Sequence, residues 1–140
     1  MAMQITNQAD YALRSMLYIA QYGQNRLTPS NIIAEEMQIS RIFLSRINSE
    51  LVGAGLIKTR RGARGGIMLA KHPAEISIYD IVTTIDGKIN LIHCTEDPDA
   101  CPLVESCPYR NFWKKTEEII ITQLKSTTLQ DMMDQAPKPA

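Results

Sequence analysis

Three cysteines lie close together in the second half of the chain, and no other residues point to so specific a chemistry. Cys94, Cys101 and Cys107 are separated by six and then five residues in the segment HCTEDPDACPLVESC. Thiolates are soft ligands that suit iron–sulfur clusters, zinc or copper(I). Structural zinc sites more often begin with cysteines two to four residues apart, so this spacing fits a zinc ribbon poorly. An odd number of clustered cysteines is also unlike a secreted disulfide scaffold.

The residues around the cysteines favour a bound metal over reactive thiolates. Proline follows both Cys101 and Cys107 and holds the backbone extended, as it also does beside cluster-binding cysteines. Four acidic residues lie in the same segment, and their negative charge disfavours three free thiolates beside them. These residues are Glu96, Asp97, Asp99 and Glu105. The segment therefore predicts a metal or cluster site. Plain redox thiols or an inert loop are the alternative.

A second distinctive segment is basic and rich in glycine. Apolar stretches LIKTRRG and GIMLA flank the turn GARGG, which predicts a β-hairpin. Glycine permits tight turning, and arginine on a thin ribbon can enter a narrow minor groove of DNA. A solvated basic turn is the alternative. The cationic residues of this hairpin are Lys58, Arg60, Arg61 and Arg64.

Two helices are predicted near the start of the chain. Residues 7–22 carry apolar side chains at helical spacing, and Gly23 supplies a stop. Thr28 before Pro29 predicts an N-cap with proline at the first helical position, and the short helix that follows runs to about Met37.

A third helix is predicted to start after Ser40 and to end at Gly53 or Gly55. Three helices followed by a hairpin is the order of a winged helix-turn-helix, in which the N-terminal residues of the second helix of the motif meet base edges. We expect the inward side chains to be Ile42, Phe43 (in part), Ile47, Leu51 and Val52. We expect DNA contacts from Ser40, Arg41, Ser45 and Arg46, although Arg41 and Arg46 could also be ordinary solvated residues.

The two halves of the chain differ in charge. Residues 1–71 hold nine Lys and Arg against four Asp and Glu, whereas residues 72–140 hold six against eleven. A basic half joined to an acidic half is one pattern expected of a nucleic-acid binder with a separate regulatory region. Chance segregation of the charges is the alternative.

The second half is predicted to be helical around the cysteine segment. Ser77 caps a helix that Gly87 closes, residues 88–108 are irregular, a long helix spans roughly 109–126, and Thr128 caps a last turn. The long helix carries more apolar surface than a small domain covers: Trp113, Ile119, Ile120, Ile121 and Leu124. It either folds back or pairs with a second copy, and we expect a homodimer.

The expected fold is thus mainly α, with a small β-hairpin wing and a long C-terminal dimerisation helix. We expect a DNA-binding domain over 1–76, a sensor and dimerisation region over 77–134 and a disordered tail over 135–140. No apolar run is long enough for a membrane span, and no export signal is recognisable, which points to the cytoplasm. An enzyme or electron carrier is the alternative, but the sequence shows no phosphate-binding loop, no catalytic triad and only two histidines.

Over roughly residues 3–134, the chain resembles the IscR/NsrR-type winged-helix transcription regulators. The resemblance rests on QADYALRSMLYIA, ELVGAGLIKTRRGARGGIMLA, IYDIVTTIDG and the cysteine segment. It implies a dimeric repressor on double-stranded operator DNA, controlled by a [2Fe–2S] or [4Fe–4S] cluster. A cluster-free regulator with a thiol redox switch is the alternative.

A cluster usually has four protein ligands, and the chain has only three cysteines. Some members of the family use a histidine three residues after the last cysteine, where this chain has Arg110. Others use an acidic residue in the first helix of the partner subunit, and Asp10 occupies that position here. A small external ligand and His93 are the other possibilities. Asp10 could equally be an ordinary carboxylate near a helix start.

Overall fold

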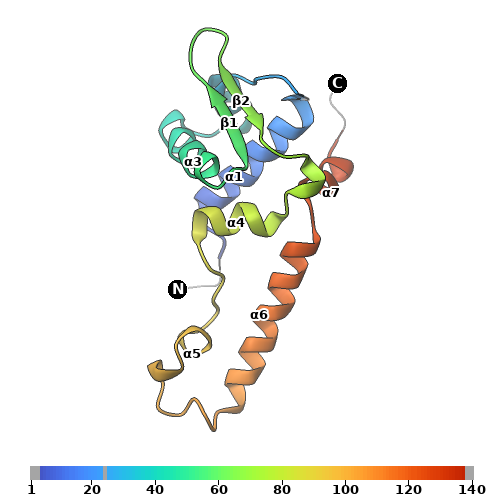
Figure 1. The fold of residues 1–140 in the computed structure, drawn as a ribbon. Coiled ribbons are helices and arrows are strands. Elements are labelled where there is room, and N and C mark those ends of the chain that lie inside the picture. The colour runs from blue at the N-terminus through green and yellow to red at the C-terminus, as the bar shows by residue number, and fades with distance from the viewer. Residues whose placement is uncertain (1–3, 24, 138–140) are drawn as a thin grey trace.

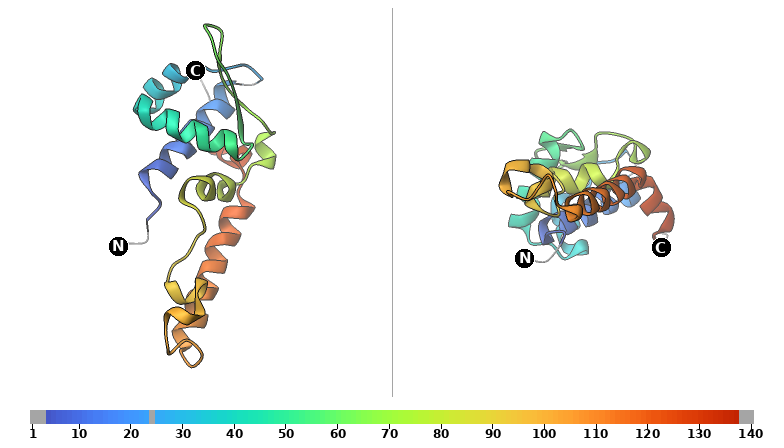
Figure 2. Two further views of the ribbon diagram at one scale, coloured as in Figure 1. Left: turned by 60° about the vertical axis from the view of Figure 1, so that its left-hand side comes forward. Right: turned by 90° about the horizontal axis from the view of Figure 1, so that it is seen from below.

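The computed structural model describes residues 4–23 and 25–137. One helix, α6 (Pro108–Ser126), projects from a unit made of the other long helices and the wing. The cysteine segment lies beside the far end of α6 (Figures 1 and 2). The wing and the cysteines are therefore at opposite ends of the molecule. Within one subunit, any influence of one on the other has to pass through the helices between them.

The first helices follow their predicted boundaries with one correction. α1 spans Asn7–Tyr18 and continues as a π-helical turn, Ile19–Gly23, while α2 spans Ser30–Met37. The prediction that Thr28 caps α2 is wrong. Thr28 instead pairs with Ile67 of the wing through two 2.8 Å backbone hydrogen bonds, and Pro29 takes the cap position with extended backbone.

The third helix, α3, spans Arg41–Gly53, and the Ser40 hydroxyl accepts a hydrogen bond from the Phe43 N–H at 3.2 Å, as its cap requires. Its orientation differs from the prediction. Leu44 is buried, whereas the side chains expected to face inward at positions 42, 43 and 52 are exposed; Ile47 and Leu51 are buried as expected. Apolar residues occur on several sides of this helix, so periodicity alone does not fix its inner face.

The predicted wing is confirmed as an antiparallel hairpin. β1 spans Ile57–Arg60 and β2 spans Gly66–Leu69, with the register running from Ile57 opposite Leu69 to Arg60 opposite Gly66. Ile57 and Ile67 are its buried side chains and hold its base on the helices.

The second half has the predicted long helices and additional short ones. A 3-10 turn, Pro73–Glu75, leads to α4, Ile78–Asp86, and the cysteine segment contains α5, His93–Glu96, and a second 3-10 turn, Pro98–Ala100. α6 spans Pro108–Ser126 and α7 spans Leu129–Gln135. Ser77 and Thr128 cap α4 and α7, each in a reciprocal pair with the Asp three residues later, and Gly87 ends α4 with a φ of 79°.

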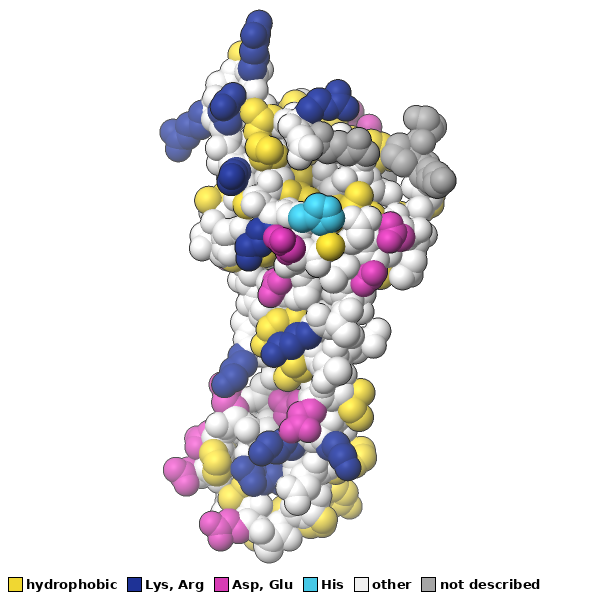
Figure 3. All heavy atoms as spheres, turned by 45° about the vertical axis from the view of Figure 1, so that its right-hand side comes forward, with side chains coloured by type: hydrophobic (Ala, Val, Ile, Leu, Met, Phe, Trp, Pro, Cys, Tyr) yellow, Lys and Arg dark blue, Asp and Glu magenta, His cyan; other side chains and the backbone are white. Residues whose placement is uncertain are grey.

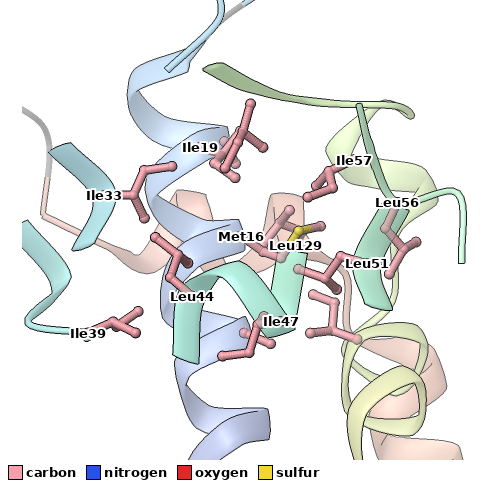
Figure 4. Packing of buried hydrophobic residues seen from close by; sticks show 14 of the residues in the cluster. Met16, Ile19, Ile33, Ile39, Leu44, Ile47, Leu51, Leu56, Ile57 and Leu129 are labelled. Atoms are coloured by element: carbon pink, nitrogen blue, oxygen red, sulfur yellow. The ribbon is translucent and has the colours of Figure 1, made fainter. Parts of the chain in front are cut away.

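The core joins helices from both halves of the chain. Met16, Leu44, Ile47 and Leu51 pack together, and Leu129 of α7 reaches the same cluster (Figure 4). A backbone bridge between Ser77 and Thr128 ties the starts of α4 and α7 together. The division at residue 76 therefore stays a prediction, since α4 and α7 share the core formed by the first 76 residues.

The predicted tail falls partly outside the described residues. Gln135 is the last residue of α7, and the Gln21 side-chain amide donates to the Pro137 carbonyl at 3.3 Å. Positions 138–140 are not described. Within residues 4–23 and 25–137, no helix has the length and apolar character needed to cross a membrane.

Replacing Thr128 by alanine is expected to lower the free energy of unfolding by about 1 kcal/mol, because the cap of α7 is lost. Thr128→Ser keeps the hydroxyl and is expected to stay close to wild type. Denaturant unfolding at one protein concentration measures both variants. Equal losses in the two would show that the methyl group matters and that the cap does not.

Candidate nucleic-acid interface and cysteine loop

The residues predicted to contact DNA are all exposed and lie on α3 and the wing. A groove of about 630 Å³ runs between α2, α3 and β1. Arg41 and Ser45 line it from α3, and Thr59 lines it from the wing. The structure thus places the start of α3 next to the wing.

The wing carries its cations away from the core. Figure 3 shows Lys and Arg side chains at the tip of the wing and along its sides. Lys58, Arg60 and Arg64 also line a second groove on the wing, where Arg26 and Asn25 contribute from the turn before α2. A polyanion with a repeating backbone charge is the ligand that such an arrangement favours.

The tip of the wing depends on glycine. At Gly65 an added Cβ would lie 2.1 Å from the Arg60 carbonyl oxygen, and Gly62 has a φ of 107°. The glycines therefore allow the two strands to turn back within a short loop, and the arginines between them project from a thin ribbon.

Sequence reasoning missed several residues of this surface. Ser30 and Asn31 at the start of α2 line the groove beside Arg41, and so does Asn48, whose side chain is 8% exposed and whose Oδ1 lacks a hydrogen-bond partner among the described residues. Arg26 belongs to the wing groove. Only the fold brings these positions to α3 and the wing, so no local sequence signal could have identified them.

The three cysteines lie on the loop between α4 and α6. All are partly exposed, and none forms a disulfide among the described residues. The loop is tied to α6 at two points: the buried Glu117 carboxylate accepts from the Leu91 N–H at 3.2 Å, and Arg110 Nε donates to the Cys94 carbonyl at 3.4 Å. Cys107 immediately precedes α6, whose first N–H groups have no side-chain cap. The positive end of this helix favours negative charge beside Cys107.

The cysteine loop has the side chains that a cluster site needs, but it does not bring them together. Three thiols on one loop are a suitable donor set for an iron–sulfur cluster. Across residues 4–23 and 25–137, however, no three His, Cys, Asp or Glu side chains gather into a group that could hold a metal ion. The donor set fits a cluster, whereas the loop conformation does not assemble it.

The proposed fourth ligand is elsewhere in the subunit. Asp10 lies on α1 and forms a 2.8 Å ion pair with Arg14, four residues later on the same helix. α1 belongs to the unit at the opposite end from the cysteine segment (Figure 1). Within one subunit the structure therefore does not bring Asp10 to the cysteines. His93 is the first residue of α5 and adjoins Cys94.

Comparison with known proteins places the chain among transcription regulators. The family model described as Rrf2, iron-dependent transcriptional regulator, matches residues 5–135. The HTH-type transcriptional regulator NsrR of Geobacillus kaustophilus is 35% identical over 133 residues, which cover 94% of this chain and 90% of that protein.

Solved structures agree over the whole fold. CymR (YrzC), the global cysteine regulator of B. subtilis, has a TM-score of 0.81 at 28% identity, covering 97% of this chain and 100% of that one. T. potens IscR has a TM-score of 0.77 at 26% identity, covering 97% and 90%. The predicted winged-helix fold is confirmed by these likenesses.

Proposed function

The chain belongs to the Rrf2 family of transcriptional regulators, and from that membership we propose that it represses transcription by binding operator DNA under control of its cysteine loop. The observation that carries the proposal is the joint exposure of the start of α3 and the arginine-rich wing on adjoining surfaces. Such a regulator acts in the cytoplasm, where the chromosome of a bacterium lies.

The DNA contacts divide between the two elements. α3 enters the major groove, where Arg46 and Ser45 reach base edges and Ser40 and Arg41 are close to phosphates or bases. The wing follows the adjacent backbone or minor groove with its cations: Lys58, Arg60, Arg61 and Arg64.

We propose a homodimer because it would cover the exposed apolar surface of α6 and suit a palindromic operator. α6 projects from the core unit, and it exposes large apolar side chains: Tyr109 at 69%, Phe112 at 58% and Ile119 at 66%. Pairing through α6 would cover this surface and present two copies of α3 to the two halves of a palindromic operator.

The cysteine loop is proposed to hold an iron–sulfur cluster of the [2Fe–2S] or [4Fe–4S] type through Cys94, Cys101 and Cys107. A bound cluster would supply a redox- and nitric-oxide-reactive centre. Asp10 of a second copy is the proposed fourth ligand, since among the described residues of one subunit Asp10 does not come together with the cysteines. The family description, iron-dependent, supports this assignment, and a thiol switch stays the alternative.

Coupling to DNA would run through the helices that flank the loop. The loop joins α4 to α6, and α4 packs against both α1 and α3. Glu117 and Arg110 hold the loop to α6. Any change in the order of the loop therefore acts on α4 and, through it, on the orientation of α3.

The test is an iron and acid-labile sulfide assay with an absorbance spectrum on anaerobically purified protein, followed by titration with DNA selected by the protein from random duplexes. We expect visible absorbance and iron, both lost in Cys101→Ser and kept in Ser106→Ala of the same loop. Operator affinity is expected to differ between the loaded and the cluster-free protein. A colourless, iron-free protein that binds DNA according to its thiol oxidation state would support the alternative switch, and equal affinity in all states would refute control by the loop.

A further inference from the structure

Ile42 is the most exposed large apolar side chain in the described part of the chain, at 80%. It is the second residue of α3. The buried apolar residues of this helix, Leu44, Ile47 and Leu51, mark its inner side. At 3.6 residues per turn, positions 42, 46 and 49 form a stripe on the opposite side. Ile42 therefore points away from the core, together with Arg46 and Ser49.

Folding gives no reason for isoleucine at this position. The neighbouring Phe43 is half-exposed and its ring lies 6.2 Å from that of Tyr11, and Val52 lines the groove toward the wing. Ile42 is absent from the core cluster, from the partly buried residues packed on it and from the lining of that groove. A β-branched residue is also a weaker helix former than the long polar residues that usually cover a solvated helix surface.

The surroundings of Ile42 are cationic and polar. Arg41 and Arg46 lie beside it on the same helix, and the wing adds further cations across the groove. Ser40 and Ser45 are the exposed polar residues nearby. A partner protein would need a broad apolar patch, and the extended apolar surface of this molecule is on α6 instead. The charge around Ile42 favours a polyanion as its partner.

We propose that Ile42 contacts the 5-methyl group of a thymine in the major groove and thereby selects thymine at one position of each operator half-site. The thymine methyl is the apolar feature that base edges present in this groove, and aliphatic side chains recognise it by contact. The inference rests on the proposed function, because it requires α3 to enter the major groove. It adds a specificity-determining residue that makes no hydrogen bond.

The test removes the methyl group from the DNA without changing any hydrogen bond. Each thymine of a selected operator is replaced in turn by deoxyuridine, and binding of the wild-type protein is measured by fluorescence anisotropy. One thymine per half-site is expected to show a three- to fivefold loss of affinity, roughly the effect of exposing one methyl group.

Variants of Ile42 assign that loss to this side chain. Ile42→Ala is expected to bind the thymine and deoxyuridine operators equally, whereas Ile42→Val keeps part of the discrimination. Because Ile42 is exposed, both variants should unfold like wild type. Equal methyl sensitivity in wild type and Ile42→Ala, or none in wild type, overturns the inference but leaves DNA binding intact. Failure of the wild type to select any duplex would instead refute the proposed function.

Discussion

Replacing Arg60, Arg61 and Arg64 together by alanine is expected to lower operator affinity roughly 100-fold at about 0.15 M salt, with no loss of fold. All three side chains are exposed on the wing, and no hydrogen bond or ion pair within the described residues uses them. Their removal leaves the core untouched and removes three cations that would otherwise displace counterions from the DNA. Each phosphate contact is worth about 0.9 in the slope of log affinity against log salt concentration.

The measurement is a salt titration of operator binding by fluorescence anisotropy. The slope of the variant is expected to be flatter than that of wild type by up to about 2.7 for each wing that contacts DNA.

The matched control is a triple variant that combines Lys88→Ala, Lys114→Ala and Lys115→Ala. These three lysines are also exposed, but they lie on or beside the arm formed by the cysteine loop and α6. The control removes the same charge. Because Lys114 and Lys115 lie on α6, its dimer mass is checked by analytical ultracentrifugation, and with an intact dimer it should change affinity and slope little. Equal losses in both variants would mean that net charge drives binding and that the wing has no specific place on the DNA.

Features of the fold that depend on neighbouring residues were predictable from the sequence. Ser40, Ser77 and Thr128 each cap the helix expected of them. In each case the hydroxyl accepts a hydrogen bond from the backbone N–H three residues later, which has no partner within the helix. The wing followed from apolar stretches on both sides of a glycine-rich turn. These signals are local, so the rest of the fold does not need to be known.

Features that depend on long-range packing were not predictable. Thr28 has the chemistry of a helix cap, but it is used in a backbone bridge to Ile67, which lies far along the chain. The inner face of α3 was assigned wrongly because its apolar residues cover more than one side. Which side is buried depends on α1 and α4, whose packing against α3 no sequence period reveals.

The candidate sites divide in the same way. The residue types of α3 and the wing were evident, but the groove that joins them includes Ser30, Asn31 and Asn48, which only the fold brings together. For the cysteines, the sequence indicates the donor chemistry. The ion pair between Asp10 and Arg14, and the distance of α1 from the loop, emerge only in three dimensions. A ligand from another subunit cannot be deduced from one chain's pattern.

Gly66→Ala is expected to destabilise the protein by about 3 kcal/mol, because the wing is joined to the turn before α2 at this glycine. An added Cβ would lie 2.6 Å from the Thr28 carbonyl oxygen and 2.7 Å from its carbonyl carbon, and both atoms belong to the backbone. Thr28 must therefore move, which strains or breaks the two hydrogen bonds between Thr28 and Ile67. The base of the wing would shift with them, so operator affinity is expected to fall as well.

The measurement is denaturant unfolding of wild type and variant at one protein concentration, since the proposed dimerisation would make stability depend on concentration. Gly53→Ala is the matched control, because an added Cβ there meets nothing within 4 Å and alanine is the better helix former. It is expected to leave stability unchanged or to raise it by up to about 1 kcal/mol. If Gly66→Ala were as stable as wild type, the close approach of the Thr28 backbone to the wing would be wrong. The wing would then be free to move relative to α2, and its arginines could not be held in a fixed position relative to α3.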